Sequence, residues 1–278
     1  MGNLGFVAKY VIKMYNCTYT YKLPHRMPKL SIILPCYNEE QVIAMTVQRV
    51  MQWLGTGRHD AEVIAVDNAS TDNTPSVLRE LCQRYPILRV VTRELNGGYG
   101  SSVRSGCDAA QGEIIAWMDA DGQFDVQDFD TLLPHLASVY FVSGIRAKRS
   151  DSWMRLLLGR MWDGVIRICF GIRARDIDCG MKAFRHDVWP LIRPTITVGD
   201  AFNSELFFRL QRCGLTWQQK PVRHLPRLTG KSGSVRLPDI LKAVIDTVRL
   251  FFAARFGSLR CPPPHHRPDL AVVPPMHT

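Results

Sequence analysis

Four short runs of apolar residues divide the first part of the chain, and each run stops at polar, turn-forming residues. The runs cover residues 30–35, 61–66, 88–92 and 114–118. A continuous apolar run of this length that ends at a turn is typical of a strand buried on both faces of a sheet. We therefore predict four buried β-strands in this part of the chain.

The stretches between these runs carry apolar residues at helical spacing. After the first run we expect a helix whose N-cap is Asn38, with Gln41 as its capping-box partner. A second helix should start around Pro75, which suits a first helical turn, and a third should end near Gln111. The alternation of strand and helix predicts an α/β fold with a largely parallel central sheet and helices on both faces. Such sheets bind ligands at the carboxyl ends of their strands.

Weaker patterns continue beyond residue 126. We expect a strand over 140–144 and four helices, over 127–138, 153–170, 201–213 and 238–256. The last helix has one charged face, with Lys242, Asp246, Arg249 and Arg255, and one apolar stripe. The members of the stripe are Ile240, Leu241, Val244, Ile245, Val248, Phe251 and Phe252. Packing against a core is the usual reason for such a stripe, and lying in a membrane interface is the alternative.

These patterns divide the chain into four parts. They are an extension (1–28), a folded domain (29–237), an amphipathic helix (238–257) and a tail rich in proline and histidine (258–278) that we expect to be disordered. The folded domain has two halves, 29–125 and 126–237.

The strand at 114–118 ends in Asp119-Ala120-Asp121-Gly122. On an extended segment this spacing puts Asp119 and Asp121 on the same side. Two carboxylates held so close repel each other, and a hard cation with oxygen ligands, Mg²⁺ or Mn²⁺, relieves that repulsion. An acidic turn with no ligand is the alternative that these four residues leave open.

Composition and charge narrow the choice of partner. The chain has 278 residues, 46% of them hydrophobic, and a net charge of +10. Residues 1–140 hold 12 basic and 15 acidic residues, whereas residues 141–278 hold 23 basic and 10 acidic residues. The basic half predicts an anionic partner, for which nucleic acid and an acidic membrane are the candidates. The basic residues lack the interleaved aromatics of a nucleic-acid-binding module, so we expect no nucleic acid partner.

Localisation follows from what the chain lacks. No run approaches the 18 apolar residues of a transmembrane helix, and residues 1–26 do not have the pattern of a signal peptide. The eight cysteines are scattered, which argues against a zinc site or a disulfide framework and favours a reducing compartment. We expect a cytoplasmic protein.

Four motifs occur in order at the predicted strand ends: ILPCYNEE (33–40), VDNASTDNT (66–74), NGGYGSSVRSG (96–106) and MDADGQFD (118–125). Together they resemble the signature of family-2 glycosyltransferases, most closely the dolichyl-phosphate mannose synthase-like branch. The resemblance extends over about residues 29–237. It implies a GT-A (Rossmann-like) fold and inverting transfer of a hexose from a GDP- or UDP-sugar to a polyprenyl phosphate. The halves 29–125 and 126–237 then become a donor half and an acceptor half.

The resemblance also assigns residues. The donor contacts it implies are Pro35, Tyr37, Glu39, Asp67, Asn68, Gly97, Gly100 and Asp119. The metal ligands it implies, for Mg²⁺ or Mn²⁺, are Asp119, Asp121 and Gln123. Asn68 stands where the branch commonly has a second aspartate, which leaves it a hydrogen-bonding role. The glycine-rich stretch could cradle a phosphate, although its spacing is not that of a Walker loop. We favour the alternative, tight packing of a helix start beneath the donor site.

The acceptor side lies in the basic half. The implied acceptor contacts are Arg146, Arg155, Asp176, Arg227, Lys231 and Ser232. Asp119, Asp121, Arg146 and Arg227 form the implied catalytic set. Cys179 and Met181 replace a serine and a phenylalanine of the branch. Glu205 matches a glutamate of the family, and a structural ion pair explains it as well as catalysis does.

The leading hypothesis is therefore a metal-dependent polyprenyl-phosphate glycosyltransferase, peripheral at the cytoplasmic face of an anionic membrane. Two alternatives stay open. One has the same donor chemistry with a soluble saccharide or small-molecule acceptor. The other is a non-catalytic protein that binds polyanions or nucleotide sugars.

Overall fold

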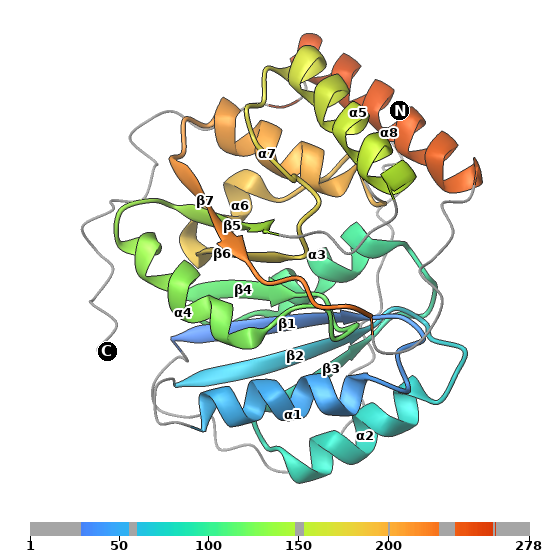
Figure 1. The fold of residues 1–278 in the computed structure, drawn as a ribbon, viewed down its shortest axis with the longest axis vertical. Coiled ribbons are helices and arrows are strands. Elements are labelled where there is room, and N and C mark those ends of the chain that lie inside the picture. Colours follow the sequence, from blue (N-terminus) through green and yellow to red (C-terminus); the bar gives the residue numbers. More distant parts are fainter. Residues whose placement is uncertain are drawn as a thin grey trace, which may run out of the picture.

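The computed structural model describes residues 29–55, 60–147, 153–199, 201–227, 237–257 and 259, and within the helices it leaves undescribed the side chains of residues 153–158, 160 and 237–240. A seven-stranded sheet crosses the molecule, with helices on both faces (Figure 1). Its strand order is β3-β2-β1-β4-β6-β5-β7. Four of the six strand pairings are parallel, which confirms the predicted α/β class.

The strands and helices predicted for residues 29–125 are all present. The four parallel strands are β1 (Leu30–Cys36), β2 (Ala61–Asp67), β3 (Leu88–Thr92) and β4 (Ile114–Met118). The helices between them are α1 (Ile43–Leu54), α2 (Thr74–Arg84) and α3 (Tyr99–Ala109). Alternate residues of the strands belong to two hydrophobic cores, one on each face of the sheet. Ile32 packs with α1 and α2, and Ile33 packs with α3. Burial on both faces explains why these strands read as continuous apolar runs.

The acceptor half contains two strands that the sequence analysis did not predict. Its strands are β5 (Phe141–Arg146), β6 (Met181–Arg185) and β7 (Trp217–Val222). β6 runs antiparallel to both β4 and β5. It was not predicted because its sequence, MKAFR, includes two cations, although all five residues are buried. β7 was not predicted because its sequence, WQQKPV, is polar, as suits a half-exposed strand at the edge of the sheet.

The helices after residue 125 are mostly where they were expected. They are α4 (Phe129–Leu132), α5 (Trp153–Phe170), α6 (Trp189–Ile192), α7 (Phe202–Arg212) and α8 (Leu237–Arg255). The prediction of one helix over 127–138 was wrong. Instead α4 lies between two 3-10 turns, η1 (Val126–Asp128) and η2 (Leu133–Ala137), and Pro134 opens η2. Proline has no N–H for the preceding helix to use, so one continuous α-helix cannot form there.

The predicted capping box was also wrong. Helix α1 begins at Ile43 with Val42 as its N-cap, and no side chain caps it. Asn38 instead has a positive φ of 56° and bonds across to the loop after β2, where its Oδ1 accepts from Thr71 N at 2.8 Å. Asn38, the predicted N-cap, therefore connects two loops and does not cap the helix.

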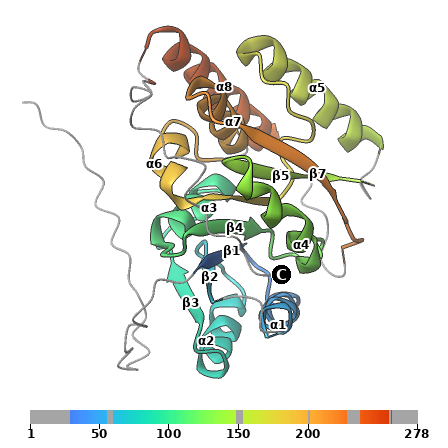
Figure 2. The same ribbon diagram turned by 90° about the vertical axis from the view of Figure 1, so that its left-hand side faces the viewer.

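The apolar stripe of α8 points away from the core. Its described members, including Leu241, Val248 and Phe252, are 41–54% exposed, whereas Asp246 on the predicted charged face is buried. Figures 1 and 2 place α8 and α5 together at the end of the molecule opposite α2. The default interpretation, core packing, does not hold for this stripe, although Leu250 of the same helix is fully buried.

Two further findings bear on localisation. Within the described part of the chain, no helix is long and apolar enough to cross a membrane. Five described cysteines are free thiols, but Cys213 is disulfide-bonded, which the argument for a reducing compartment had not anticipated.

Candidate functional site

The loops after β1 and β2 form one unit at the carboxyl edge of the sheet. The backbone N–H of Asn38 donates to Ser70 Oγ at 3.0 Å, and that of Glu39 donates to Thr74 Oγ1 at 2.8 Å. Two predicted motifs, far apart in the sequence, are thereby held together. This brings the predicted donor residues Glu39 and Asp67 to the same edge.

Asp119 lies where β4 ends. Its backbone N–H donates to Gly180 O at 3.1 Å, and its Oδ1 is buried with no hydrogen-bond partner in the described structure. Burial, together with the charge of Asp121, raises the pKa of Asp119 to about 6. A Cβ on residue 180 would lie 1.8 Å from Asp119 Oδ2, so only glycine fits against this carboxylate. Sequence reasoning did not identify Gly180.

Arg227 joins the two halves of the site. Its Nη2 lies 3.4 Å from Asp121 Oδ2 and 3.5 Å from Glu39 Oε1. Burial and the charge of Asp121 raise the pKa of Glu39 to about 7, and Arg227 opposes this rise. A residue assigned to the acceptor thus contacts two carboxylates assigned to the metal and the donor.

Gln123 contributes to this arrangement through its backbone and its side-chain amide. Leu225 N donates to Gln123 O at 2.7 Å, and Gln123 Nε2 donates to Leu225 O at 3.3 Å. The adjacent residues Phe124 and His224 form an antiparallel bridge. This short pairing places the segment that contains Arg227 beside Asp121. A role of Gln123 as a metal ligand stays a prediction.

The carboxylates fit a divalent cation. No group of three or more His, Cys, Asp or Glu side chains in the described ranges could hold a metal by itself. Mg²⁺ and Mn²⁺, however, are commonly bound by one or two carboxylates together with substrate phosphates. The buried, unpartnered Oδ1 of Asp119 is a free acceptor of the required kind.

The glycine-rich loop is built for packing. The Asn68 side-chain amide donates to Asn96 Oδ1 at 2.9 Å and to Gly98 O at 3.3 Å, which holds the loop in place. A Cβ on Gly100 would lie 2.3 Å from the Cβ of Phe202 in α7. These contacts agree with the packing interpretation. Donor contacts of Pro35, Tyr37, Gly97 and Gly100 stay predictions.

On the acceptor side, the structure brings Arg146 and Asp176 together. Arg146 Nε and its backbone N–H each donate to Asp176 Oδ2 at 2.9 Å, and Nη2 donates to Oδ1. Asp176 has a positive φ of 47°. A pair held by several bonds fixes the orientation of the guanidinium. The Arg155 side chain is not described, and Lys231 and Ser232 lie outside the described residues.

Lys182 is a buried cation that sequence reasoning missed. It is fully buried in β6, its Nζ donates to Cys179 O, and burial lowers its pKa. Nζ lies 5.3 Å from the ring centroid of Trp117, and Asp119 is among the carboxylates that oppose the lowering of its pKa. A lysine inside the apolar run MKAF was the available signal.

Glu205 has the structural role. Its Oε2 accepts from the backbone N–H of Ile196 at 3.0 Å and of Thr197 at 2.7 Å. Its Oε1 pairs with Arg209 at 2.7 Å. These bonds tie α7 to the segment that precedes it, so the ion-pair interpretation is the one the geometry supports.

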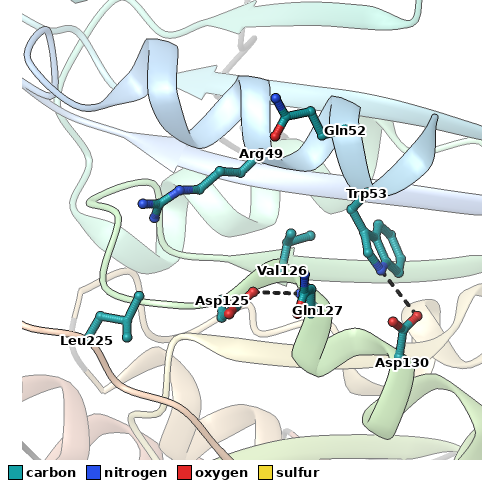
Figure 3. Close-up of a pocket in the computed structure, with 8 residues that line it drawn as sticks. All are labelled: Arg49, Gln52, Trp53, Asp125, Val126, Gln127, Asp130 and Leu225. Atoms are coloured by element: carbon teal, nitrogen blue, oxygen red, sulfur yellow. Dashed lines mark hydrogen bonds between the residues drawn. The ribbon is translucent and has the colours of Figure 1, made fainter. Parts of the chain in front are cut away.

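A cleft of about 700 Å³ lies beside this site rather than in it (Figure 3). It is formed by α1, by the 125–130 segment and by Leu225, and it contains none of the predicted site residues. In Figure 3, Arg49 extends from α1 toward the segment that carries Leu225. Leu225 connects the cleft to the site through its bonds with Gln123.

The raised pKa of Asp119 predicts a pH dependence of metal binding. A cation binds the ionised carboxylate, so protonation competes with it below a pKa of about 6. We expect Mn²⁺ affinity to fall about tenfold between pH 7.5 and 5.0, with proton release on binding near pH 6. Calorimetric titrations in buffers of different ionisation enthalpy measure both quantities. An affinity that does not change over this range would contradict the prediction.

The chain resembles known proteins both in sequence and in structure. The sequence model "Glycosyl transferase family 2" matches residues 31–193. An undecaprenyl-phosphate 4-deoxy-4-formamido-L-arabinose transferase of Edwardsiella ictaluri is 32% identical over 57% of this chain and 50% of its own. A dodecaprenyl-phosphate galacturonate synthase of Rhizobium johnstonii is 30% identical over 59% and 50%. The chain thus spans about half the length of these relatives.

Solved structures show the same fold. Glucosyl-3-phosphoglycerate synthase of Mycobacterium tuberculosis, in complex with Mn²⁺, UDP and glucosyl-3-phosphoglycerate, has a TM-score of 0.59 at 20% identity, over 83% of this chain and 80% of its own. A mannosyltransferase of Pyrobaculum calidifontis, in complex with GDP-Man and Mn²⁺, has a TM-score of 0.59 at 22% identity, over 87% and 68%.

Proposed function

The chain belongs to glycosyl transferase family 2, and from that premise we propose that it is a metal-dependent, inverting hexosyltransferase that uses a GDP- or UDP-sugar donor and a polyprenyl-phosphate acceptor. One observation carries the proposal. Arg227, from the acceptor half, contacts Asp121 and Glu39, from the donor half, in a single site. Two relatives named for polyprenyl-phosphate substrates support the choice of acceptor.

Asp119 and Asp121 would hold the cation. When bound, Mg²⁺ or Mn²⁺ acts as a Lewis acid that stabilises the charge developing on a departing nucleoside diphosphate. The chain contributes a rigid carboxylate for it, because Gly180 lets β6 approach Asp119 closely. Asp67 at the end of β2 would accept hydrogen bonds from the base or the ribose of the donor.

Arg146 and Arg227 would orient the acceptor. A polyprenyl phosphate is already ionised at neutral pH, so it needs cationic positioning more than a general base. Asp176 holds the Arg146 guanidinium in one orientation. The Arg227 side chain is 28% exposed, and its Nη2 lies 3.4 Å from Asp121, one of the carboxylates proposed to hold the cation.

The proposal includes peripheral association with an anionic membrane at its cytoplasmic face. The outward face of α8 exposes large apolar side chains, among them Val248 (48%) and Phe252 (52%), and Phe256 (77%) follows directly after the helix. The exposed cations Lys242 and Arg249 lie on the same helix. An apolar helix face flanked by cations suits the boundary between headgroups and acyl chains.

Vesicle flotation tests this part of the proposal. We expect the protein to float with vesicles that contain anionic lipid, and the double variant Val248→Ser/Phe252→Ser to lose most of this binding because it removes buried apolar area in the bilayer. The control is Leu95→Ser, since Leu95 is 79% exposed far from α8 in the sequence. Equal flotation of the double variant and the control would contradict a role for this face.

The activity itself is tested by transfer assays. GDP- and UDP-hexoses are incubated with Mn²⁺ and either a short-chain polyprenyl phosphate or soluble saccharides, and the products are separated by organic extraction. Lipid-linked sugar supports the proposal. Product with the soluble acceptor alone would establish the first alternative, and donor binding without any transfer would establish a non-catalytic protein.

A further inference from the structure

The cleft beside the site has its own set of polar side chains (Figure 3). Its volume of about 700 Å³ lies within the range of about 300–1,000 Å³ that is typical of small-molecule sites. Arg49 and Gln52 come from α1, and Gln127 comes from the turn η1. None of these three residues has a role in the proposed transfer reaction.

The two carboxylates that line the cleft already have partners within the protein. Asp125 Oδ2 pairs with Arg223 Nη1 at 2.9 Å, and Asp125 Oδ1 accepts from the backbone N–H of Gln127 at 3.0 Å. Asp130 Oδ1 accepts from Trp53 Nε1 at 3.2 Å. The charge of Asp125 is therefore compensated by Arg223, and the cleft is not an acidic site in search of a cation.

Arg49 is the charged residue of the cleft whose binding capacity is unused. It is half-buried, and it makes no hydrogen bond or ion pair with any residue that the structure describes. The side-chain amides of Gln52 and Gln127 also lack a partner among the described residues. A guanidinium has five N–H donors and no acceptor, so an anion satisfies it best.

These unused groups define the chemistry of a ligand. The planar fork of an arginine matches an oxyanion, and a phosphate monoester carries more negative charge at neutral pH than a carboxylate does. Primary amides both donate and accept hydrogen bonds, which suits hydroxyl groups. Val126 and Leu225 add apolar wall against which the C–H groups of a sugar ring can pack.

We propose that the cleft is a second binding site, for a sugar phosphate whose phosphate pairs with Arg49 and whose hydroxyls bond to Gln52 and Gln127. The inference does not depend on the proposed transfer reaction, because the cleft contains none of the residues assigned to that reaction. Leu225 borders the cleft and bonds to Gln123. The ligand therefore lies next to the transfer site without occupying it.

Isothermal titration calorimetry with glucose 1-phosphate, in the absence of divalent cations, measures this binding. Arg49→Gln should weaken it about tenfold or more, because the variant removes the charge that pairs with the phosphate. Arg79→Gln is the matched control: Arg79 is exposed in α2, outside the cleft, so this variant should bind like the unchanged protein. Gln127→Ala should weaken the binding of glucose 1-phosphate but not that of inorganic phosphate.

Each outcome supports or overturns the proposal. Absence of binding, or an equal loss in Arg49→Gln and Arg79→Gln, would overturn the site. Inorganic phosphate that binds as tightly as glucose 1-phosphate would overturn the sugar. Thermal melts show whether the variants fold, and if Arg49→Gln does not, the comparison of the two ligands in Gln127→Ala decides.

A repeat of the titration with saturating UDP and Mn²⁺ separates the cleft from the donor site. Unchanged affinity for glucose 1-phosphate supports the cleft, whereas loss of binding would place the ligand in the donor site and overturn the proposal. If the protein transfers no sugar but binds glucose 1-phosphate through Arg49, the proposed function fails and the second site stands.

Discussion

Asp121→Asn should lower kcat/KM for sugar transfer by about 10³-fold, equivalent to about 4 kcal/mol of transition-state stabilisation. The substitution removes one of the two carboxylates proposed to hold the cation, and it also removes a partner of Arg227. The loss of charge lowers the affinity for Mn²⁺. It also removes one cause of the raised pKa of Glu39. Steady-state kinetics at several Mn²⁺ concentrations distinguish weak metal binding from slow chemistry.

The matched control for this substitution is Asp130→Asn. Asp130 is an exposed carboxylate nine residues further along the chain that accepts a hydrogen bond from Trp53 Nε1 at 3.2 Å, and an amide oxygen can still accept it. Its activity should stay within about twofold of the unchanged protein. Full activity of Asp121→Asn would exclude metal-assisted catalysis through this residue.

Gly180→Ala should be nearly as damaging, for a steric reason. The added Cβ would lie 1.8 Å from Oδ2 and 2.2 Å from Cγ of Asp119, so the carboxylate has to move. A displacement of this size at a catalytic group costs about 10²-fold in rate. Overpacking adds about 1–3 kcal/mol of lost stability. Transfer kinetics, Mn²⁺ titration and thermal unfolding measure the three effects.

Gly164→Ala provides the control. Gly164 lies in α5, and a Cβ there would contact nothing within 4 Å. Alanine is favoured over glycine within a helix by about 1 kcal/mol, so this variant should be slightly more stable and fully active. If Gly180→Ala binds Mn²⁺ and transfers sugar like Gly164→Ala, then Asp119 does not need this close contact.

Local pattern was enough to predict the donor half. β4 covers Ile114–Met118, as the sequence predicts, because a strand buried on both faces must be apolar throughout. The placement of Asp67 and Asp119 at strand ends follows from the same runs. Capping was less predictable: Asn38 has the chemistry of an N-cap, but the loop after β2 offers it partners that are 32–33 residues away.

The acceptor half shows where local pattern fails. β6 carries Lys182, whose burial is compensated by Cys179 O and nearby carboxylates, and no local rule anticipates that compensation. The stripe on α8 was correctly identified as one face, but its direction depends on what α8 packs against. Leu250 and Asp246 face inward while Val248 and Phe252 face out.

The sequence by itself therefore determined the strand order of the donor half along the chain and the carboxylates that end its strands. The tertiary structure decided which groups meet: Arg227 reaches Asp121, 106 residues away, and Gly180 lies directly against the Asp119 carboxylate. The physical reason is the distance along the sequence over which each effect acts. Hydrophobic periodicity and turn chemistry act over a few residues, whereas the pairing of buried charges depends on contacts that form only when distant strands share one sheet.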